Sequence, residues 1–242
     1  MRWIYLSPHL DDAVLSCGGL IFEQSRQDQQ VEIWTILAGA PPAGPLSKFA
    51  LENHALWGMT GGPETVAMRR AEDEEAAGLV GAGQVHFDLP DCIYRISSQG
   101  QYLYTETVIT SPHPADRELP GRMADALRSE LSESDVLVCP LALGGHVDHL
   151  LVRQAAEILQ RPMHYYADVP YVLNYPQVLA PAVAALKNRL YPVSETGLET
   201  WLKGVAAYRS QVSSLLKVDG NLFDAIRSYW SASGGICLWQ LH

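Results

Sequence analysis

Short runs of apolar residues alternate with segments of helical periodicity along most of the chain. The apolar runs predict strands over residues 3–6, 31–37, 84–89, 135–140, 163–169 and 236–241. The periodic segments predict helices over residues 11–27, 64–79, 120–131, 146–160 and 198–216. Strands that alternate with helices in this way are typical of βαβ units. We therefore expect an α/β protein with a Rossmann-like, three-layer α/β/α fold and a mainly parallel sheet.

Two segments interrupt the alternation. Residues 41–62 are rich in proline and glycine, which predicts a long loop over the edge of the sheet. Residues 101–110 are rich in β-branched and aromatic residues, which indicates a hairpin arm or an insertion. Because 242 residues suit one domain, and no repeat or linker is visible, we expect a single domain over residues 1–242.

Composition and charge restrict the partners. The formal net charge of −10 argues against nucleic acids and anionic membrane surfaces, since both attract basic protein faces. No apolar run approaches the length of a membrane span or of a signal-peptide core. The four cysteines lack CxxC spacing, which indicates reduced, buried thiols rather than disulfides or a zinc ribbon. We expect a cytoplasmic protein whose partner is a small molecule.

Histidine and aspartate side chains follow two of the predicted strands directly, and in both places a helix is predicted to begin. These residues are His9, Asp11 and Asp12 after the first strand, and His146, Asp148 and His149 after the strand over 135–140. The carboxyl ends of parallel strands meet at one edge of a sheet, where such folds place their sites. We therefore expect the two groups to converge on one divalent metal ion, with one further carboxylate beside it that is not a ligand.

Three of these side chains are the predicted metal ligands. His9 and Asp12 are three residues apart at a strand-to-helix turn, so both can reach one point, and His149 is the third ligand. Imidazole nitrogen and carboxylate oxygen suit Zn²⁺, although these ligand types also accept iron, manganese or cobalt. Three protein ligands leave a coordination position for water, whose pKa a catalytic zinc lowers to about 7.

The remaining three side chains have the chemistry for amide hydrolysis. Asp11 projects separately from Asp12 and is the expected general base that takes a proton from the water. His146, if protonated, stabilises the oxyanion of a tetrahedral intermediate and then donates to the leaving amine. Asp148 is expected to orient a neighbouring imidazole by a hydrogen bond. The pattern predicts a metal-dependent amide hydrolase.

Both motifs resemble those of a known family. The segment SPHLDDAVLSCGG at residues 7–19 resembles the PHPDDE motif of the LmbE/PIG-L family of zinc-dependent N-acetylglucosaminide deacetylases. The segment GGHVDH at residues 144–149 resembles that family's HPDH motif. The segment at residues 69–81 is similar to its RxxE helix, and residues 203–211 are similar to its late helix. The chain departs from the first motif at Leu10 and Ala13, and neither position is a ligand.

The resemblance implies the same roles as the spacing does. It gives the metal ligands as His9, Asp12 and His149, the base as Asp11, and the oxyanion group as His146 with Asp148 as its partner. It also implies that Arg69 and Asp91 bind the substrate, although an ion pair on the helix and an Asx turn account for them equally well. The implied reaction removes an N-acetyl group from an amino-sugar conjugate. A homo-oligomer is one of the assembly states that the family allows.

Other readings remain open beside this one. The chain could hydrolyse another acylated small molecule, such as a natural product or a sugar-thiol precursor, or it could be a non-catalytic carbohydrate-binding relative. A nucleotide-binding Rossmann protein is excluded, because PHLDD stands where the GxGxxG loop would be and its carboxylates repel phosphate. His113 and Asp116 repeat the HxxD spacing between prolines, and we expect a surface turn or the rim of a substrate site there rather than a metal site.

Overall fold

A seven-stranded sheet forms the centre of the computed structural model, which describes residues 1–215 and 221–241. The strands lie in the order β3-β2-β1-β4-β5-β7-β6. Their bounds are β1 (Arg2–Ser7), β2 (Gln30–Thr35), β3 (Gly83–His86), β4 (Val136–Pro140), β5 (Met163–Tyr166), β6 (Lys187–Pro192) and β7 (Gly235–Gln240). Strands β1 to β5 pair in parallel, and β7 runs antiparallel to both β5 and β6. The predicted α/β fold with a mainly parallel sheet is confirmed.

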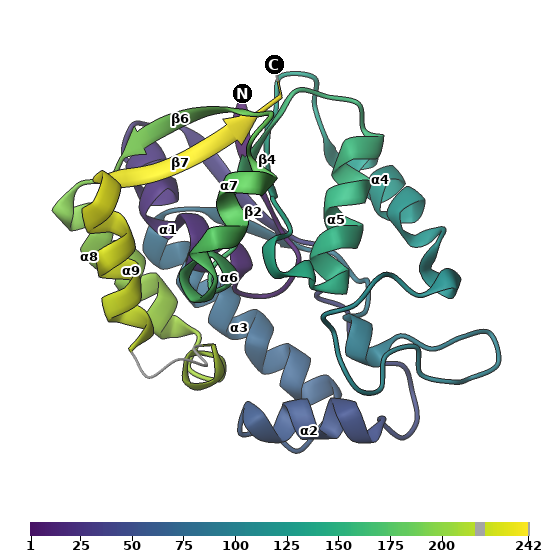
Figure 1. Cartoon of the computed structure of the whole chain (residues 1–242). Helices are drawn as coiled ribbons and strands as arrows, with labels where there is room; N and C mark the ends of the chain where they lie inside the picture. Colours follow the sequence, from purple (N-terminus) through teal and green to yellow (C-terminus); the bar gives the residue numbers. More distant parts are fainter. Residues whose placement is uncertain (216–220, 242) are drawn as a thin grey trace.

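Helices cover both faces of the sheet. They are α1 (Asp12–Ser25), α2 (Lys48–Leu56), α3 (Pro63–Val80), α4 (Leu119–Glu130), α5 (Val147–Ile158), α6 (Tyr171–Asn174), α7 (Leu179–Ala182), α8 (Glu195–Ala207) and α9 (Leu222–Ser233). Helices α1, α3 and α8 pack against one another on one face, and α4 and α5 pack together on the other (Figure 1). None of the described helices is both long enough and apolar enough to cross a membrane.

The core is built from the predicted apolar runs. Residues of β1, such as Ile4 and Leu6, have no exposed surface, as expected for a strand with neighbours on both sides and helices on both faces. Gly18 lets α1 approach α8 closely, because a Cβ atom there would lie 2.6 Å from the Trp201 ring. The Trp201 indole N–H donates to the carbonyl of Val14 at 2.8 Å, so the two helices are also joined by a hydrogen bond.

Helix α2 was not predicted, since the proline and glycine content of residues 41–62 indicated a loop throughout. In the structure Ser47 caps this helix by accepting a hydrogen bond from the Ala50 N–H at 3.0 Å. Ala50 and His54 are the residues of this helix that are buried. Helix α2 lies across the end of α3, near the carboxyl ends of the strands (Figure 1). It therefore belongs to the site rather than to the edge of the sheet.

Other segments also differ from the prediction, among them the unpredicted helix α9. Residues 101–110 form no strand, and only isolated bridges such as Ile96–Tyr102 occur near them, so the hairpin arm was wrong. The helix predicted over 198–216 ends at Ala207, and Leu216 lies outside the described residues. Strand β6 was not predicted, because it is an exposed edge strand whose polar residues give no alternating pattern.

Candidate active site

The turn between β1 and α1 is held by its own side chains. The Ser7 hydroxyl accepts from the Ala13 N–H at 3.0 Å and donates to the His9 carbonyl at 2.7 Å. The Asp12 carboxylate accepts from the His9 N–H at 2.8 Å. These bonds fix His9, Asp11 and Asp12 in one short turn at the carboxyl end of a central strand, as the sequence predicted.

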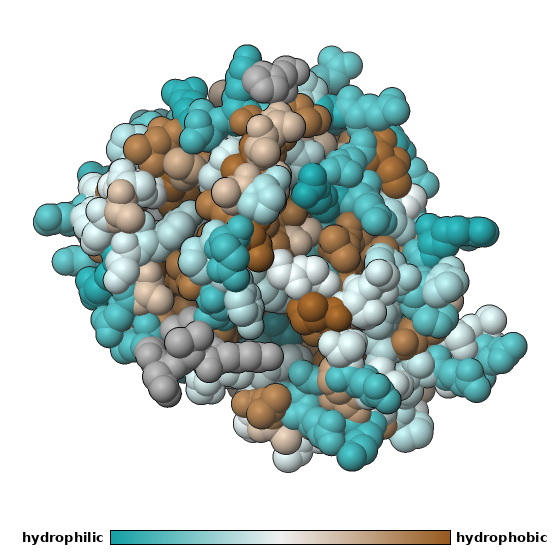
Figure 2. All heavy atoms as spheres, viewed as in Figure 1, coloured by the Kyte–Doolittle hydropathy of each residue, from teal (hydrophilic) through white to brown (hydrophobic). Residues whose placement is uncertain are grey.

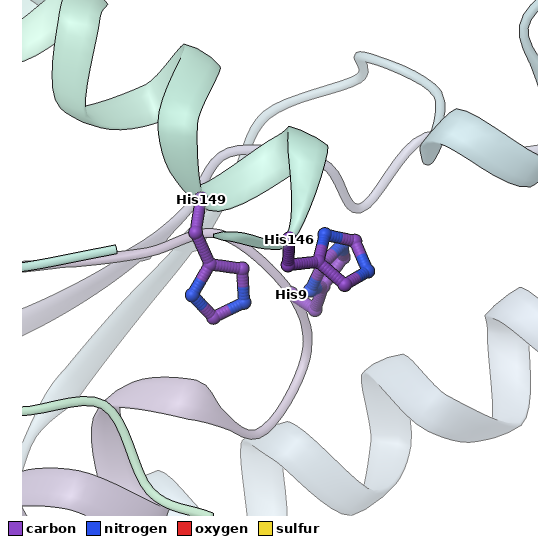
Figure 3. Close-up of side chains that lie close together, drawn as sticks. All are labelled: His9, His146 and His149. Carbon is purple, nitrogen blue, oxygen red and sulfur yellow. The ribbon is translucent and has the colours of Figure 1, made fainter. Parts of the chain in front are cut away.

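The turn between β4 and α5 brings in the second group. Gly144 and Gly145 have φ values of +79° and +71°, which favour glycine, and a Cβ atom on Gly144 would overlap the Tyr171 ring. His146 caps α5, since its Nδ1 accepts from the Asp148 N–H at 3.1 Å. The His149 side chain then extends from the first turn of the helix toward the β1 turn (Figure 3).

The three predicted metal ligands lie together. The Asp12 Oδ2 atom is 3.3 Å from His9 Nδ1 and 3.3 Å from His149 Nε2. Two ligand atoms bound about 2.0–2.1 Å from a tetrahedral zinc ion lie about 3.3–3.4 Å apart, so these separations fit one such ion. His146 is close by, since nitrogen atoms of His9, His146 and His149 lie within 4.8 Å of one another (Figure 3).

The second ring nitrogen of His9 and that of His149 each contact a buried carboxylate. His9 Nε2 lies 3.0 Å from Asp148 Oδ2, and His149 Nδ1 lies 2.7 Å from Asp168 Oδ1. Carboxylates in this position fix the tautomer of metal-ligating histidines and orient their rings. Sequence reasoning missed Asp168, although it follows the predicted strand over 163–169 at the same edge of the sheet and the strand-end rule points to it.

The electrostatics of this cluster favour a cation. Burial opposes positive charge on His149, yet Asp12 and Asp168 raise its pKa to about 9. Burial likewise opposes charge on His9, but Asp91, Asp12 and Asp148 raise its pKa well above the usual range. Burial acts to raise the pKa of Asp12. The charges of His149 and His9, and their hydrogen bonds to the carboxylate, outweigh burial and hold this pKa far below its usual value. The site thus combines ionised oxygen ligands with imidazoles in a buried position.

A model of the family described as "PIG-L: GlcNAc-PI de-N-acetylase" matches residues 4–159 of the chain. The match spans more than half of the sequence and includes both turns described above. The chain belongs to the PIG-L family. The resemblance of the two sequence motifs is therefore confirmed, and the PIG-L motifs are the segments that build the histidine and aspartate cluster.

Several proteins that the chain is similar to are named as deacetylases. A 2'-N-acetylparomamine deacetylase from Niallia circulans is 27% identical over 232 residues, which cover 88% of this chain and 82% of that protein. The zinc-inhibited form of the teicoplanin deacetylase Orf2 has a TM-score of 0.86 and 27% identity, covering 99% of this chain and 97% of that chain. The structure of the A40926 pseudoaglycone deacetylase Dbv21 has a TM-score of 0.80 and 27% identity, and the match covers 99% of this chain and 96% of that chain.

Asp11 lies beside the cluster of His9, Asp12 and His149, where its carboxylate faces the cavity. Its carboxylate lines the cavity next to Asp12 and lies 3.7 Å from the Arg69 guanidinium. Burial, followed by the neighbouring charge of Asp12, raises the pKa of Asp11 to about 6, although Arg69 and His9 oppose this shift. A carboxyl group with this pKa can take up and release a proton near neutral pH.

His146 differs from its predicted protonation state. Its Nδ1 atom accepts a hydrogen bond from a backbone N–H, so the proton of the neutral ring lies on Nε2. Burial and the charges of His9 and His149 lower the pKa of His146 well below its usual value. The structure therefore favours a neutral ring with an Nε2–H donor over the imidazolium expected from the sequence.

Asp148 also has a partner other than the predicted one. Its carboxylate contacts His9, accepts from the Cys92 N–H at 2.9 Å and binds the Arg95 guanidinium at 2.6 Å. Only its backbone N–H bonds to His146. The pairing of the Asp148 side chain with His146 was wrong, because the carboxylate points toward the β1 turn rather than along its own helix.

The HxxD segment at residues 113–116 contributes to the ion pairs around Arg95. Asp116 accepts from Arg95 Nε at 3.0 Å and from the Tyr104 hydroxyl at 2.7 Å. His113 caps a 3-10 turn by accepting from the Ala115 N–H. Arg95 thus joins two buried carboxylates, Asp116 and Asp148. Sequence reasoning missed Arg95, because nothing in the sequence shows which carboxylates surround it.

The two other segments that resemble family motifs, at residues 69–81 and 203–211, contact each other. Glu72 of α3 accepts from the Ser210 N–H at 3.0 Å and from the Ser210 hydroxyl at 2.6 Å. The Gln211 amide in turn donates to the Ser210 hydroxyl at 2.9 Å. This chain of bonds fixes the segment after α8 so that Gln211 and Ser214 line the cavity.

A cavity of about 570 Å³ opens above the cluster, in the size range of sites for drug-sized molecules. Figure 2 shows a hollow on this face of the molecule, flanked by hydrophobic side chains. Arg69 and Asp91 line the cavity as predicted, whereas Arg70 binds the Ala38 carbonyl outside it. Asp91 also forms the alternative Asx turn, accepting from the Ile93 N–H at 3.1 Å.

Proposed function

We propose that this chain is a metal-dependent N-deacetylase that hydrolyses the N-acetyl group of an amino-sugar conjugate to acetate and a free amine. The observation that carries the proposal is the position of the Asp12 carboxylate, 3.3 Å from a nitrogen of His9 and from a nitrogen of His149, with Asp11 beside it in the cavity. The deacetylases named among its relatives support the same reaction class.

His9, Asp12 and His149 are the residues that hold the metal ion. The fit is supported by the 3.3 Å separations and by the carboxylates behind both imidazoles. When bound, a divalent ion polarises the acetyl carbonyl and lowers the pKa of water, which makes attack on an amide feasible near neutral pH. Zn²⁺ is the ion we propose, and the same ligand set suits other divalent transition metals.

Asp11 moves the proton. Its carboxylate accepts a proton from the attacking water as the oxygen–carbon bond forms. The same carboxyl group then returns that proton to the amide nitrogen as the carbon–nitrogen bond breaks, so acetic acid and the free amine leave with the atoms in balance, and together they ionise to acetate and an ammonium group. Arg69, 3.7 Å away, keeps the carboxylate ionised before the reaction begins.

His146 stabilises the charge that develops on the acetyl oxygen. Its neutral ring is held by the Nδ1 hydrogen bond, which leaves the Nε2–H to donate toward the oxyanion. Arg69 and Asp91, both on the cavity wall, are the groups we propose for the sugar hydroxyls.

The test is turnover by the metal-loaded protein. The purified chain is stripped, reloaded in turn with Zn²⁺, Co²⁺, Mn²⁺ or Fe²⁺, and given N-acetylglucosamine conjugates and non-sugar acetamides, with acetate and amine measured. We expect release from the sugar conjugates with at least one metal. Because a relative is described in a zinc-inhibited form, excess Zn²⁺ is a separate arm. Release only from non-sugar amides would instead identify another amidase, and no release with any metal would refute a catalytic role.

A further inference from the structure

His9 and His149, the two imidazoles proposed to hold the metal ion, are supported in different ways. His149 contacts Asp168, whose second oxygen accepts from a backbone N–H. His9 contacts Asp148, whose second oxygen accepts from a side chain, the Arg95 guanidinium, at 2.6 Å. A side-chain donor needs supports of its own, so the orientation of His9 depends on what fixes Arg95.

Arg95 joins Asp148 to a second buried carboxylate, that of Asp116. The guanidinium donates from Nη1 to Asp148 Oδ1 at 2.6 Å and from Nε to Asp116 Oδ2 at 3.0 Å. All three residues are buried, with Arg95 the most exposed of them at 6%. Because the guanidinium is planar and its donors are fixed relative to one another, it cannot rotate without losing one of these two charge-assisted bonds.

Asp116 is in turn fixed by Tyr104. The Tyr104 hydroxyl donates to Asp116 Oδ2 at 2.7 Å and accepts from the His113 N–H at 2.8 Å. The centre of the Tyr104 ring also lies 5.2 Å from the guanidinium carbon of Arg95. The carboxylate of the HxxD segment is therefore anchored to Tyr104 on one side and to Arg95 on the other.

The charges in this chain of contacts favour a strong acceptor beside His9. One guanidinium forms ion pairs with two carboxylates, so one negative charge is left over. Asp116 takes up part of the positive charge of Arg95, and Asp148 Oδ2 thus retains negative charge where it lies 3.0 Å from His9 Nε2. Such an acceptor keeps the imidazole proton on Nε2 and leaves Nδ1, the atom that faces Asp12, unprotonated for a metal ion.

From these contacts we infer that Asp116 is a positioning residue for the metal site, which acts through Arg95 and Asp148 to fix the tautomer and the ring orientation of His9. Each contact between Asp116 and His9 along this route is 3.0 Å or shorter. The inference rests on the proposed metal ion, because it requires His9 to be a ligand. It gives the HxxD segment a function in the site although Asp116 is not a ligand.

The first test measures metal affinity rather than turnover. Asp116→Asn keeps the size of the side chain and removes its charge, and competition with a chelator gives the affinities for Zn²⁺ and Co²⁺. Loss of a carboxylate in direct contact with a ligand costs about 10–100-fold, so we expect a loss of about three- to tenfold from this more distant position. Asp125→Asn, which breaks the exposed pair with Arg128, is the matched control and should leave the affinity unchanged. Wild-type affinity in a folded Asp116→Asn protein would overturn the inference.

Double variants separate the route through Asp148 from a general effect of the substitution. In an Asp148→Asn background, Asp116→Asn should cause no further loss of metal affinity, because the group through which it acts is changed already. In an Asp168→Asn background the loss should keep its full size, because Asp168 supports the other imidazole. Equal losses in the two backgrounds would indicate a through-space charge effect or a loosened fold, and would overturn the inference.

Arg95→Lys tests the bridge between the two carboxylates, and it also serves if Asp116→Asn does not fold. Lysine keeps the positive charge, but its ammonium group lacks the rigid fork that holds both carboxylates of the wild-type protein. We expect the metal affinity to fall about three- to tenfold. The visible absorption spectrum of the Co²⁺-loaded protein should change as well, because His9 reorients. An Arg95→Lys protein with wild-type affinity and spectrum would overturn the inference.

Failure of this inference is distinguishable from failure of the proposed reaction. A protein whose metal affinity depends on Asp116 as expected, but which releases no acetate, would refute the reaction and retain the positioning role. Acetate release by the wild-type protein, with unchanged metal affinity in Asp116→Asn, would refute the positioning role and retain the reaction. A wild-type protein that binds no divalent ion would overturn both.

Discussion

Asp168 Oδ1 lies 2.7 Å from His149 Nδ1, while the other ring nitrogen of His149 faces Asp12. Asp168 is also fixed by the Leu143 N–H, which donates to Oδ2 at 3.1 Å. The imidazole is therefore held between two carboxylates, one on each ring nitrogen. We therefore expect Asp168 to orient His149 for the proposed metal ion without being a ligand itself.

Asp168→Ala should weaken metal binding by about 10–100-fold, because His149 loses the acceptor that sets its tautomer and ring orientation. Asp168→Asn retains an oxygen acceptor and should lose less. Competition with a chelator measures both affinities, and circular dichroism verifies the fold. Wild-type affinity in a folded Asp168→Ala protein would contradict the assigned role.

Asp11→Asn should retain the metal and lose most of the turnover. Asparagine is nearly the same size as aspartate but cannot accept a proton from water, so we expect kcat to fall by about 10²–10⁴-fold. Metal content by mass spectrometry is the companion measurement. His149→Ala is the contrasting variant and should lose the metal. An Asp11→Asn enzyme with wild-type kcat would show that another group is the base.

The pH–rate profile should fall on the acid side. Asp11 acts as a base only when ionised, so kcat/KM declines as pH drops through its pKa. Burial and Asp12 raise that pKa to about 6, and a bound cation beside the carboxylate lowers it. The decline in kcat/KM on the acid side should therefore be centred at or below pH of about 6 and should correspond to the uptake of one proton. It should be absent from the residual activity of Asp11→Asn. A decline centred above pH of about 7 would contradict this assignment.

Arg95→Met should destabilise the fold strongly. Arg95 is buried between Asp148 and Asp116, and its removal takes the guanidinium away from two buried carboxylates. Breaking a buried pair in this way costs about 3–5 kcal/mol in the free energy of unfolding. Arg128→Met breaks the exposed pair with Asp125 and should cost less than about 1 kcal/mol. Urea unfolding compares the two, and similar losses would show that Arg95 is not compensating buried charge.

The sequence predicted the fold and the convergence of the cluster for one physical reason. Buried parallel strands require continuous apolar runs, and their carboxyl ends must meet at one edge. His9, Asp12 and His149 follow such runs, so their proximity could be inferred from residue order alone.

The direction of individual side chains could not be inferred in the same way. Asp148 stands between two histidines in the sequence, yet its carboxylate bonds to His9, 139 residues away. Helix α2 escaped prediction because its nine residues lie between proline-rich and glycine-rich segments, and its burial depends on tertiary contacts of His54. Strand β6 could not be predicted, because an exposed edge strand needs no alternating pattern of apolar residues.

The match to the family model ends at residue 159, whereas Tyr175, Val178 and Leu215 of the cavity wall come later in the chain. Two residues beside the cluster, Asp168 and Tyr171, also belong to that later part. Part of the pocket wall in this chain is therefore built outside the segment that carries the two histidine and aspartate turns. Transplanting the segments around residues 171–178 and 211–215 into another member is the shortest route to changing which conjugate it accepts.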